Sequence, residues 1–251
     1  MAEADRQMEK NIVVSRRLKM LADLVTPGSV VADVGCDHGF LSIYLVQQGI
    51  CPHVIAADVR KGPLEGARLH IRAAGLEAYI ETRLSDGVKA FSPGEADSLV
   101  CAGMGGRLMQ QILMDCPETT VSFRELILQP QSELYAFRRF LRSQGWAVEE
   151  ERILREDGKY YFPMKVVLKG EKAEEPFAEN RLYDKFGKAL LQRREPVLKE
   201  YLEKCLAECR KVEATLLGNL ENSVNRKRLE ESLAENQGEI RDLLRALDYF
   251  A

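Results

Sequence analysis

The sequence predicts an α/β domain built on a mostly parallel sheet, followed by an antiparallel hairpin of long helices. Three observations support this prediction. A short apolar run from Val30 ends in a glycine-rich turn, Gly35-Cys-Asp-His-Gly39, and a helical pattern follows at once. Further short apolar runs alternate with helical patterns up to residue 168, as in sheets whose parallel strands are joined by crossover helices. Beyond residue 176 the chain has very few Gly or Pro residues, and apolar residues recur at spacings of three and four.

The pattern predicts seven strands. After a first helix over about Met8–Val25, a strand leads into the Gly35–Gly39 turn. The other expected strands cover residues 53–58, 79–84, 97–102, 125–130, 147–154 and 161–168. The intervening helices are expected at residues 41–48, 61–74, 108–114 and 132–144. Because the connection between the last two strands is short, they should form an antiparallel hairpin at one edge of the sheet.

The C-terminal region predicts a coiled coil. Two apolar seams, separated by an interruption at Gly218–Ser223, are formed by Leu198, Leu202, Cys205, Cys209, Val212 and Leu216 and by Leu229, Leu233, Asn236, Ile240, Leu243 and Leu247. Two seams separated by a turn should fold back on each other. Since composition changes at Gly170, we expect an α/β domain over residues 1–170 and a helical hairpin over residues 171–251, with a polar linker at 171–176. The hairpin is interpreted either as a dimerisation element or as an arm that orients a large substrate.

Composition limits the classes of function. A net charge of −3 over 251 residues argues against a generic polyanion-binding protein and leaves only local basic patches for nucleic acid. The sequence has no apolar run of membrane-spanning length and a charged N-terminus, so we expect a cytoplasmic protein without a membrane partner. The six cysteines and three histidines have no zinc-binding spacing, so no metal is expected.

The glycine-rich turn indicates the ligand. A dinucleotide site needs Gly-x-Gly-x-x-Gly to seat a pyrophosphate, whereas this chain has Gly35-x-x-x-Gly39 with Asp37 at the middle glycine position. A carboxylate repels a pyrophosphate and suits a cation, and S-adenosylmethionine carries a sulfonium and an ammonium group. The turn looks like the first motif of S-adenosylmethionine-dependent methyltransferases. An NAD site and a tight turn without a ligand are the alternatives.

Later strand ends supply further candidates. Asp58 lies 19 residues past Gly39, near the distance at which an acid at the end of the second strand meets a ribose diol. Asp86, after the third strand, could accept from an adenine amine or could be an ordinary turn residue. Three glycines in Gly103-Met-Gly-Gly106 leave the backbone after the fourth strand open to close approach by a planar base.

Taken together, these motifs resemble the bacterial tRNA (adenine(22)-N1)-methyltransferases over about residues 10–250. The resemblance rests on the runs Asp33–His38, Ala102–Gly106, Leu126–Pro130 and Gly158–Tyr161 and on the helical hairpin. It implies a Rossmann-like class I methyltransferase domain with a C-terminal coiled coil. It also implies S-adenosyl-L-methionine as donor, S-adenosyl-L-homocysteine as product and adenine N1 in the tRNA D-arm as target. Cys36, the run His38–Ser42 and the Phe162-Pro163 pair depart from the family pattern, so the resemblance assigns no role to Phe40 or Tyr161.

On this basis the sequence predicts three groups of site residues. The cofactor should be bound by Asp33, Gly35, Asp37, His38, Gly39, Asp58, Val59, Ser85, Asp86, Gly87, Ala102, Gly103 and Met104. Catalytic contacts are expected from Asp37, His38 and Met104, with Asp37 or His38 near the charge that develops on the methylated ring. The substrate should be bound by Arg16, Arg17, Gly105, Gly106, Arg107, Gln129, Arg138 and Tyr160.

The partner is therefore expected to be tRNA and not DNA, and the protein a monomer, with a dimer through the hairpin as the alternative. Two other functions stay open from the sequence alone. One is a methyltransferase for another RNA, a protein or a small molecule. The other is a non-catalytic Rossmann-like protein that binds RNA or a partner.

Overall fold

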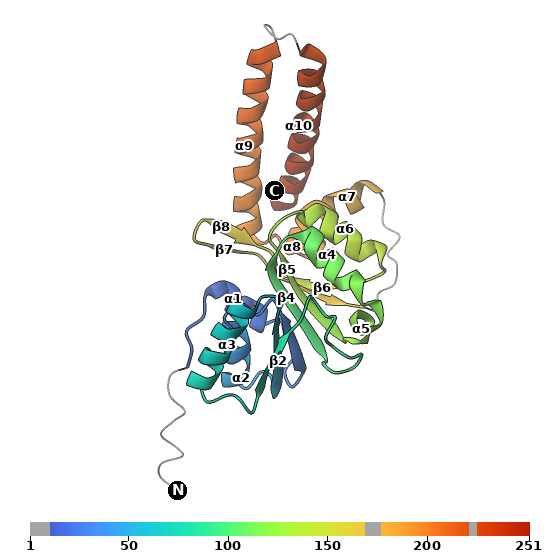
Figure 1. Cartoon of the computed structure of the whole chain (residues 1–251). Helices are drawn as coiled ribbons and strands as arrows, with labels where there is room; N and C mark the ends of the chain where they lie inside the picture. Colours follow the sequence, from blue (N-terminus) through green and yellow to red (C-terminus); the bar gives the residue numbers. More distant parts are fainter. Residues whose placement is uncertain (1–10, 169–176, 221–224) are drawn as a thin grey trace. The chain divides into compact units, whose positions relative to one another are not determined.

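The computed structural model describes residues 11–168, 177–220 and 225–251 (Figure 1). The chain forms two compact units, residues 1–174 and 175–251. The predicted domain boundary at 170/171, the linker at 171–176 and the part of the predicted interruption at 221–223 lie outside the described residues. None of the described helices is long and apolar enough to cross a membrane.

The first unit contains a seven-stranded sheet in the order β3-β2-β1-β4-β5-β9-β6. Its strands are β1 (Val30–Val34), β2 (His53–Asp58), β3 (Ile80–Leu84), β4 (Ser98–Met104), β5 (Glu125–Pro130), β6 (Ala147–Glu151) and β9 (Met164–Val167). β1 to β5 pair in parallel, and β9 pairs antiparallel with both β5 and β6. The predicted mostly parallel, Rossmann-like sheet of seven strands is confirmed.

Helices cover both faces of this sheet, as side-chain alternation along buried parallel strands requires. On one face, α1 (Arg16–Ala22), α2 (Phe40–Gln47) and α3 (Lys61–Ala73) share a core with Val31. On the other, α4 (Gly106–Asp115) and α6 (Leu134–Ser143) share a core with Ala32. The short helix α5 (Pro117–Ser122) was not expected, because Pro117 begins a helix at its first turn rather than only ending α4.

The first helix is shorter than predicted. Residues 11–15 are not helical, and α1 begins only after Ser15, whose hydroxyl caps it by accepting from the amide of Leu18 at 3.3 Å. Val13 is 94% exposed, so no packing favours a helix there. The prediction of a helix from about Met8 is therefore wrong over residues 11–15, and its first residues lie outside the described part of the chain.

The last two predicted strands were each too long. Between β6 and β9 the chain forms a separate two-stranded hairpin, β7 (Leu154–Glu156) and β8 (Lys159–Tyr161). Asp157 and Gly158 turn between them with φ values of 49° and 75°, as a two-residue hairpin loop requires. The predicted antiparallel pairing of β6 with β9 is confirmed.

The second unit is helical. It contains α7 (Phe177–Phe186), α8 (Lys188–Gln192), α9 (Pro196–Leu220), α10 (Arg226–Leu247) and a final 3₁₀ turn, η2 (Asp248–Phe250). The long helices α9 and α10 pack along each other, which confirms the predicted helical hairpin, although α9 continues through Gly218. The side-chain amide of Asn236 donates to the carbonyl of Cys209 at 2.9 Å, so the one polar seam residue fixes the register of the two helices.

Candidate functional site

The turn between β1 and α2 has an unusual backbone that brings it close to neighbouring strand ends. Gly35 and Gly39 have φ values of 76° and 74°, and Asp37, between them, also has a left-handed φ of 52°. The amides of Gly35 and Cys36 both donate to the carbonyl of Ala57, at 2.8 and 3.0 Å, and tie the turn to the end of β2. A Cβ atom on Gly35 would lie 2.1 Å from the Cε atom of Met104, so a side chain there would displace the end of Met104 and would also be strained at a φ of 76°.

Two buried carboxylates flank this turn. Asp33 is 4% exposed and accepts a hydrogen bond from the Ser42 hydroxyl at 2.6 Å. Burial raises the pKa of Asp33 to about 6, the Ser42 hydrogen bond opposes the shift, and the nearby charge of Asp58 adds to it. Asp58 is 3% exposed and accepts from the amides of Asp37 at 3.3 Å and Arg60 at 2.8 Å. Negative charge therefore concentrates at the carboxyl ends of β1 and β2.

A cleft of about 520 Å³ opens at these strand ends. Among the predicted cofactor residues, its lining includes Gly35, Asp37, Asp58, Val59, Ser85, Asp86, Gly87, Ala102, Gly103 and Met104. Asp33 and His38 line a smaller cavity that shares Gly35, Asp37 and Ala102 with the cleft. Four strand ends and their loops thus meet at one cavity, as in ligand sites of open parallel sheets.

Two of the predicted cofactor residues have another structural explanation. Gly39 lines neither cavity, and a Cβ atom on it would lie 3.1 Å from that of Ala67, so it lets α2 begin close to α3. The carboxylate of Asp86 is paired with the Lys89 ammonium, which also lies 3.1 Å from Asp115.

Five cleft residues were not among the predicted site residues: Val34, Arg60, Leu108, Ile112 and Gln131. Arg60 follows Val59 directly and could have been included with it. Leu108 and Ile112 are four apart on one helix, and their spacing alone predicts only an apolar helix face. Gln131 follows Pro130, and its place on the cleft wall depends on the tertiary fold.

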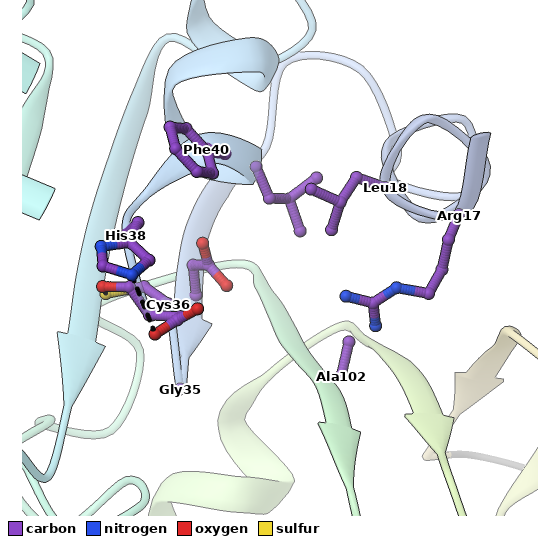
Figure 2. Close-up of a pocket in the computed structure, with 10 residues that line it drawn as sticks. Arg17, Leu18, Gly35, Cys36, His38, Phe40 and Ala102 are labelled. Atoms are coloured by element: carbon purple, nitrogen blue, oxygen red, sulfur yellow. Dashed lines mark hydrogen bonds and ion pairs between the residues drawn. The ribbon is translucent and has the colours of Figure 1, made fainter. Parts of the chain in front are cut away.

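Arg17 lines both the cleft and the smaller cavity. Its guanidinium donates to the side-chain oxygen of Gln129 at 2.7 Å and lies 5.5 Å from the ring centre of Tyr161. Figure 2 shows the side chain reaching from α1 toward Ala102. The carboxylate of Glu156, on β7, accepts from the main-chain amides of Arg16 and Arg17 at 2.7 and 3.3 Å. The hairpin β7–β8 therefore holds the start of α1, and with it Arg17, beside the cleft.

The other predicted substrate residues are spread over different environments. Gln129 is fully buried and contacts Arg17 rather than the cleft, while Arg138 is 5% exposed and pairs with Glu151 at 2.7 Å. A Cβ atom on Gly106 would lie 2.7 Å from the Ser132 carbonyl oxygen, so close packing accounts for this glycine.

The remaining predicted substrate residues lie nearer the surface. The side chains of Arg16 and Arg107 are exposed. A Cβ atom on Gly105 would lie 3.2 Å from the Ser132 hydroxyl. Strand alternation puts Tyr161, rather than Tyr160, next to Arg17, and Tyr160 faces Arg155 instead.

His38 lies at the mouth of the smaller cavity. Its side chain is 50% exposed, and its Nε2 atom is 3.9 Å from the Asp37 carboxylate (Figure 2). The ring lies against α3 where Gly66 leaves space, because a Cβ atom there would be 2.7 Å from the His38 Nδ1 atom. Within the described residues no group of His, Cys, Asp and Glu side chains could hold a metal ion. The geometry thus provides a nucleoside-sized cleft that is lined by the carboxylates of Asp37, Asp58 and Asp86 and by the arginines Arg17 and Arg60.

Comparison with known proteins connects this geometry to a family. A family model described as a methyltransferase domain matches residues 14–164. A tRNA (adenine(22)-N(1))-methyltransferase of Bacillus subtilis is 36% identical over 148 residues, which cover 59% of this chain and 62% of that protein. The match therefore spans less than two thirds of that relative's length.

Solved structures extend the likeness to both units. The crystal structure of the B. subtilis m1A22 tRNA methyltransferase has a TM-score of 0.82 and 26% identity, covering 94% of this chain and 99% of that one. A Streptococcus pneumoniae protein that carries the provisional name of tRNA (m1A22) methyltransferase, solved in complex with S-adenosyl-L-methionine, has a TM-score of 0.75 and 30% identity. That match covers 94% of this chain and 100% of the other.

Proposed function

The chain belongs to the methyltransferase-domain family and resembles its tRNA (adenine(22)-N1)-methyltransferases, and from that premise we propose that it methylates N1 of adenine 22 in the D-arm of tRNA. The methyl donor is S-adenosyl-L-methionine, and the product released with the methylated tRNA is S-adenosyl-L-homocysteine. The observation that carries this proposal is the continuous cleft from Asp58, past the Gly35–Gly39 turn, to Gly103 and Met104.

The residues of the cleft fit this donor. Each oxygen of the Asp58 carboxylate accepts one main-chain hydrogen bond and keeps a lone pair for a ribose hydroxyl. Val59 and Ile112 give the same region an apolar wall suited to an adenine ring. At the other end, the carboxylates of Asp33 and Asp37 suit the positive charges of the amino-acid part.

The chemistry asks little of the protein beyond geometry. When bound, the donor supplies an electrophilic methyl group on a sulfonium. Adenine N1 already carries an in-plane lone pair, so the chain needs no strong base and must orient the ring. Gly103 and Met104 line the cleft where that ring would approach. Asp37, whose side chain is 62% exposed, supplies negative charge near the ring that becomes cationic, and His38 beside it contributes to the same surface.

The tRNA is bound mainly through its phosphates. Arg17 lies at the cleft, and the exposed side chains of Arg16 and Arg107 lie on the neighbouring helices α1 and α4. In the second unit, α10 begins with the exposed run Arg226-Lys-Arg228. We propose that residues 1–170 form the catalytic domain and residues 171–251 an arm that orients tRNA, that the enzyme works as a monomer in the cytoplasm, and that binding weakens as salt rises.

The experiment is methylation of unmodified tRNA with labelled donor, followed by mapping of the modified base. We expect one methyl group on N1 of adenine 22 and none on a matched tRNA with guanine at that position. Asp58→Ala should lower donor affinity at least tenfold, since the ribose loses a charge-assisted hydrogen bond. Methyl on N6, or on a nucleotide outside the D-arm, would contradict the proposal.

A further inference from the structure

An aromatic pair lies just outside the catalytic cleft. Phe40, the first residue of α2, is 39% exposed, and its ring stacks on that of His70 from α3 with centroids 4.8 Å apart and planes 23° apart. The His70 ring is fixed in this position, because its Nδ1 atom donates to the main-chain carbonyl of His38 at 3.0 Å. A stacked pair held by a main-chain hydrogen bond is a preformed flat surface.

This pair forms one wall of a separate groove of about 440 Å³. The groove, here called the outer groove, lies between segment 11–13, the α2 residues Phe40, Ile43 and Gln47, and the α3 residues His70, Ala73 and Ala74. Its opposite side is fixed as well, because the amide of Ile12 donates to the side chain of Gln47 at 2.8 Å. The lining is mainly apolar, with amide groups only at Asn11 and Gln47.

The outer groove is continuous with the catalytic site through one residue. Phe40 lines both the outer groove and the smaller cavity that contains Asp33, Asp37 and His38. Figure 2 shows Phe40 and His38 among the residues that line the smaller cavity. A wall shared by two cavities offers a polymer whose target base enters the cleft a second surface for the next base, on the far side of Phe40.

We propose that the outer groove binds a second nucleobase of the tRNA, the one adjacent to the methylated adenine, by stacking on the Phe40–His70 pair; this rests on the proposed function. Aromatic surfaces accept any base by stacking, so the groove needs no base-specific contact to act. Unstacking the target adenine from its neighbour in the D-arm has a free-energy cost, and a stacking partner for the neighbour offsets part of it. His70 is therefore a substrate-positioning residue outside the donor site.

A double-mutant cycle between protein and RNA tests this proposal. The tRNA dissociation constant is measured for wild type, His70→Leu and His70→Phe, each with intact tRNA and with tRNA carrying an abasic site on one or the other side of the target adenine. His70→Leu removes the aromatic face at similar size, whereas His70→Phe keeps it. Leu69→Ala is the matched control, because Leu69 neighbours His70 on α3, is 64% exposed and does not line the outer groove.

The expected result is a roughly tenfold weaker binding of intact tRNA by His70→Leu, with His70→Phe and Leu69→Ala close to wild type. One of the two abasic tRNAs should bind wild type about as weakly as intact tRNA binds His70→Leu. The same abasic site should not weaken the binding of tRNA to His70→Leu any further. Equal losses from the abasic site in wild type and His70→Leu would overturn the proposal. Donor affinity, measured by calorimetry on each variant, reports whether the fold is intact.

The two proposals fail in different ways. Failure of the wild type to methylate adenine 22 would contradict the proposed function, while the binding cycle would still show whether a base occupies the groove. Conversely, normal methylation with no coupling in the cycle would remove only the outer-groove proposal.

Discussion

Two buried carboxylates at opposite ends of the same sheet have opposite electrostatic environments. Glu125 begins β5 at the amino end and accepts from the Thr26 amide and hydroxyl, the Ser98 hydroxyl and the Lys165 ammonium, all at 2.6–2.8 Å. Burial acts to raise its pKa, but these hydrogen bonds, with that from Lys165 the largest, outweigh burial and lower the pKa below the ordinary value. Asp33, near the carboxyl end of β1, accepts from the Ser42 hydroxyl at 2.6 Å, and burial raises its pKa to about 6.

The contrast separates stability from function. At the amino end, a buried charge is neutralised by a cation and several donors, so it stabilises the folded state. At the carboxyl end, Asp58 accepts from two main-chain amides and lies 3.6 Å from the Arg60 guanidinium, whereas the buried charge of Asp33 destabilises the unliganded fold and would be relieved by a cationic ligand. Such uncompensated charge in a cleft is typical of functional sites.

The largest effect is expected at the amino end. Glu125→Gln removes the carboxylate and leaves Lys165, which is 17% exposed, without that partner, so the free energy of unfolding should fall by about 3 kcal/mol. Urea denaturation at pH 7.5 measures this. Because the folded pKa of Glu125 lies below its unfolded value, its stabilisation is present above the unfolded pKa and is lost as pH falls through the folded pKa. The double variant Glu125→Gln/Lys165→Met should recover part of the loss; a larger loss would mean that the pair is not the cause.

Asp33→Asn should raise the free energy of unfolding, whereas Glu125→Gln should lower it. For wild type without ligand, the raised pKa means that the contribution of Asp33 is fully favourable below about 3.8 and is lost as pH rises through about 6. The asparagine variant removes this loss, so at pH 7.5 it should be about 2 kcal/mol more stable than wild type. Donor affinity, measured by calorimetry, should fall at least tenfold. If Asp33→Asn were less stable than wild type and bound the donor equally well, the assignment of Asp33 to ligand binding rather than to stability would be contradicted.

Local sequence patterns were sufficient for the parts of the fold that depend on neighbouring residues. The bounds of β2 and β5 were predicted as they are found, because each is a short apolar run with clear turn signals on both sides. The Gly35–Gly39 turn and most of the cleft followed, because the carboxyl ends of parallel strands meet at one edge. The turn at Asp157-Gly158 lies within the turn that the sequence predicts at residues 155–159. The hairpin β7–β8 was not predicted as a separate element, because the residues beside this turn read as continuations of the two long strands.

Side-chain direction was predicted less well, since it depends on residues far apart in the chain. Gln129 was expected to face the substrate, but Arg17, 112 residues away, takes its side-chain oxygen. Arg138 was expected at the substrate, but Glu151 on β6 forms a buried ion pair with it. An arginine on a helix has the same local pattern whether it meets a phosphate or a buried acid. Only the packing of α6 on the sheet distinguishes the two.

Gly35→Ala tests whether the backbone conformation at the carboxyl end of the sheet is required for donor binding. The new methyl group would collide with Met104, and alanine at a φ of 76° costs about 1–2 kcal/mol. Gly28→Ala is the matched control, because its φ is 85° and nothing lies within 4 Å of its added Cβ atom. Thermal unfolding should show a similar backbone cost in both variants and an additional loss at Gly35. Only Gly35→Ala should weaken donor binding, and equal effects of the two variants on donor affinity would remove Gly35 from the site.

Glu156→Gln is expected to have the smallest effect on stability and a larger effect on the KM for tRNA. Glu156→Gln has one oxygen instead of two for the amides of Arg16 and Arg17, so the first turn of α1 loosens and Arg17 loses its fixed position. Loss of an anion at a helix N-terminus costs about 0.5 kcal/mol. Glu150→Gln is the control, because Glu150 pairs with Arg152 on the same segment and does not contact α1. We expect Glu156→Gln to raise the KM for tRNA a few-fold with donor affinity unchanged, whereas Glu150→Gln should change neither; equal KM values for the two variants would show that the hairpin does not position Arg17.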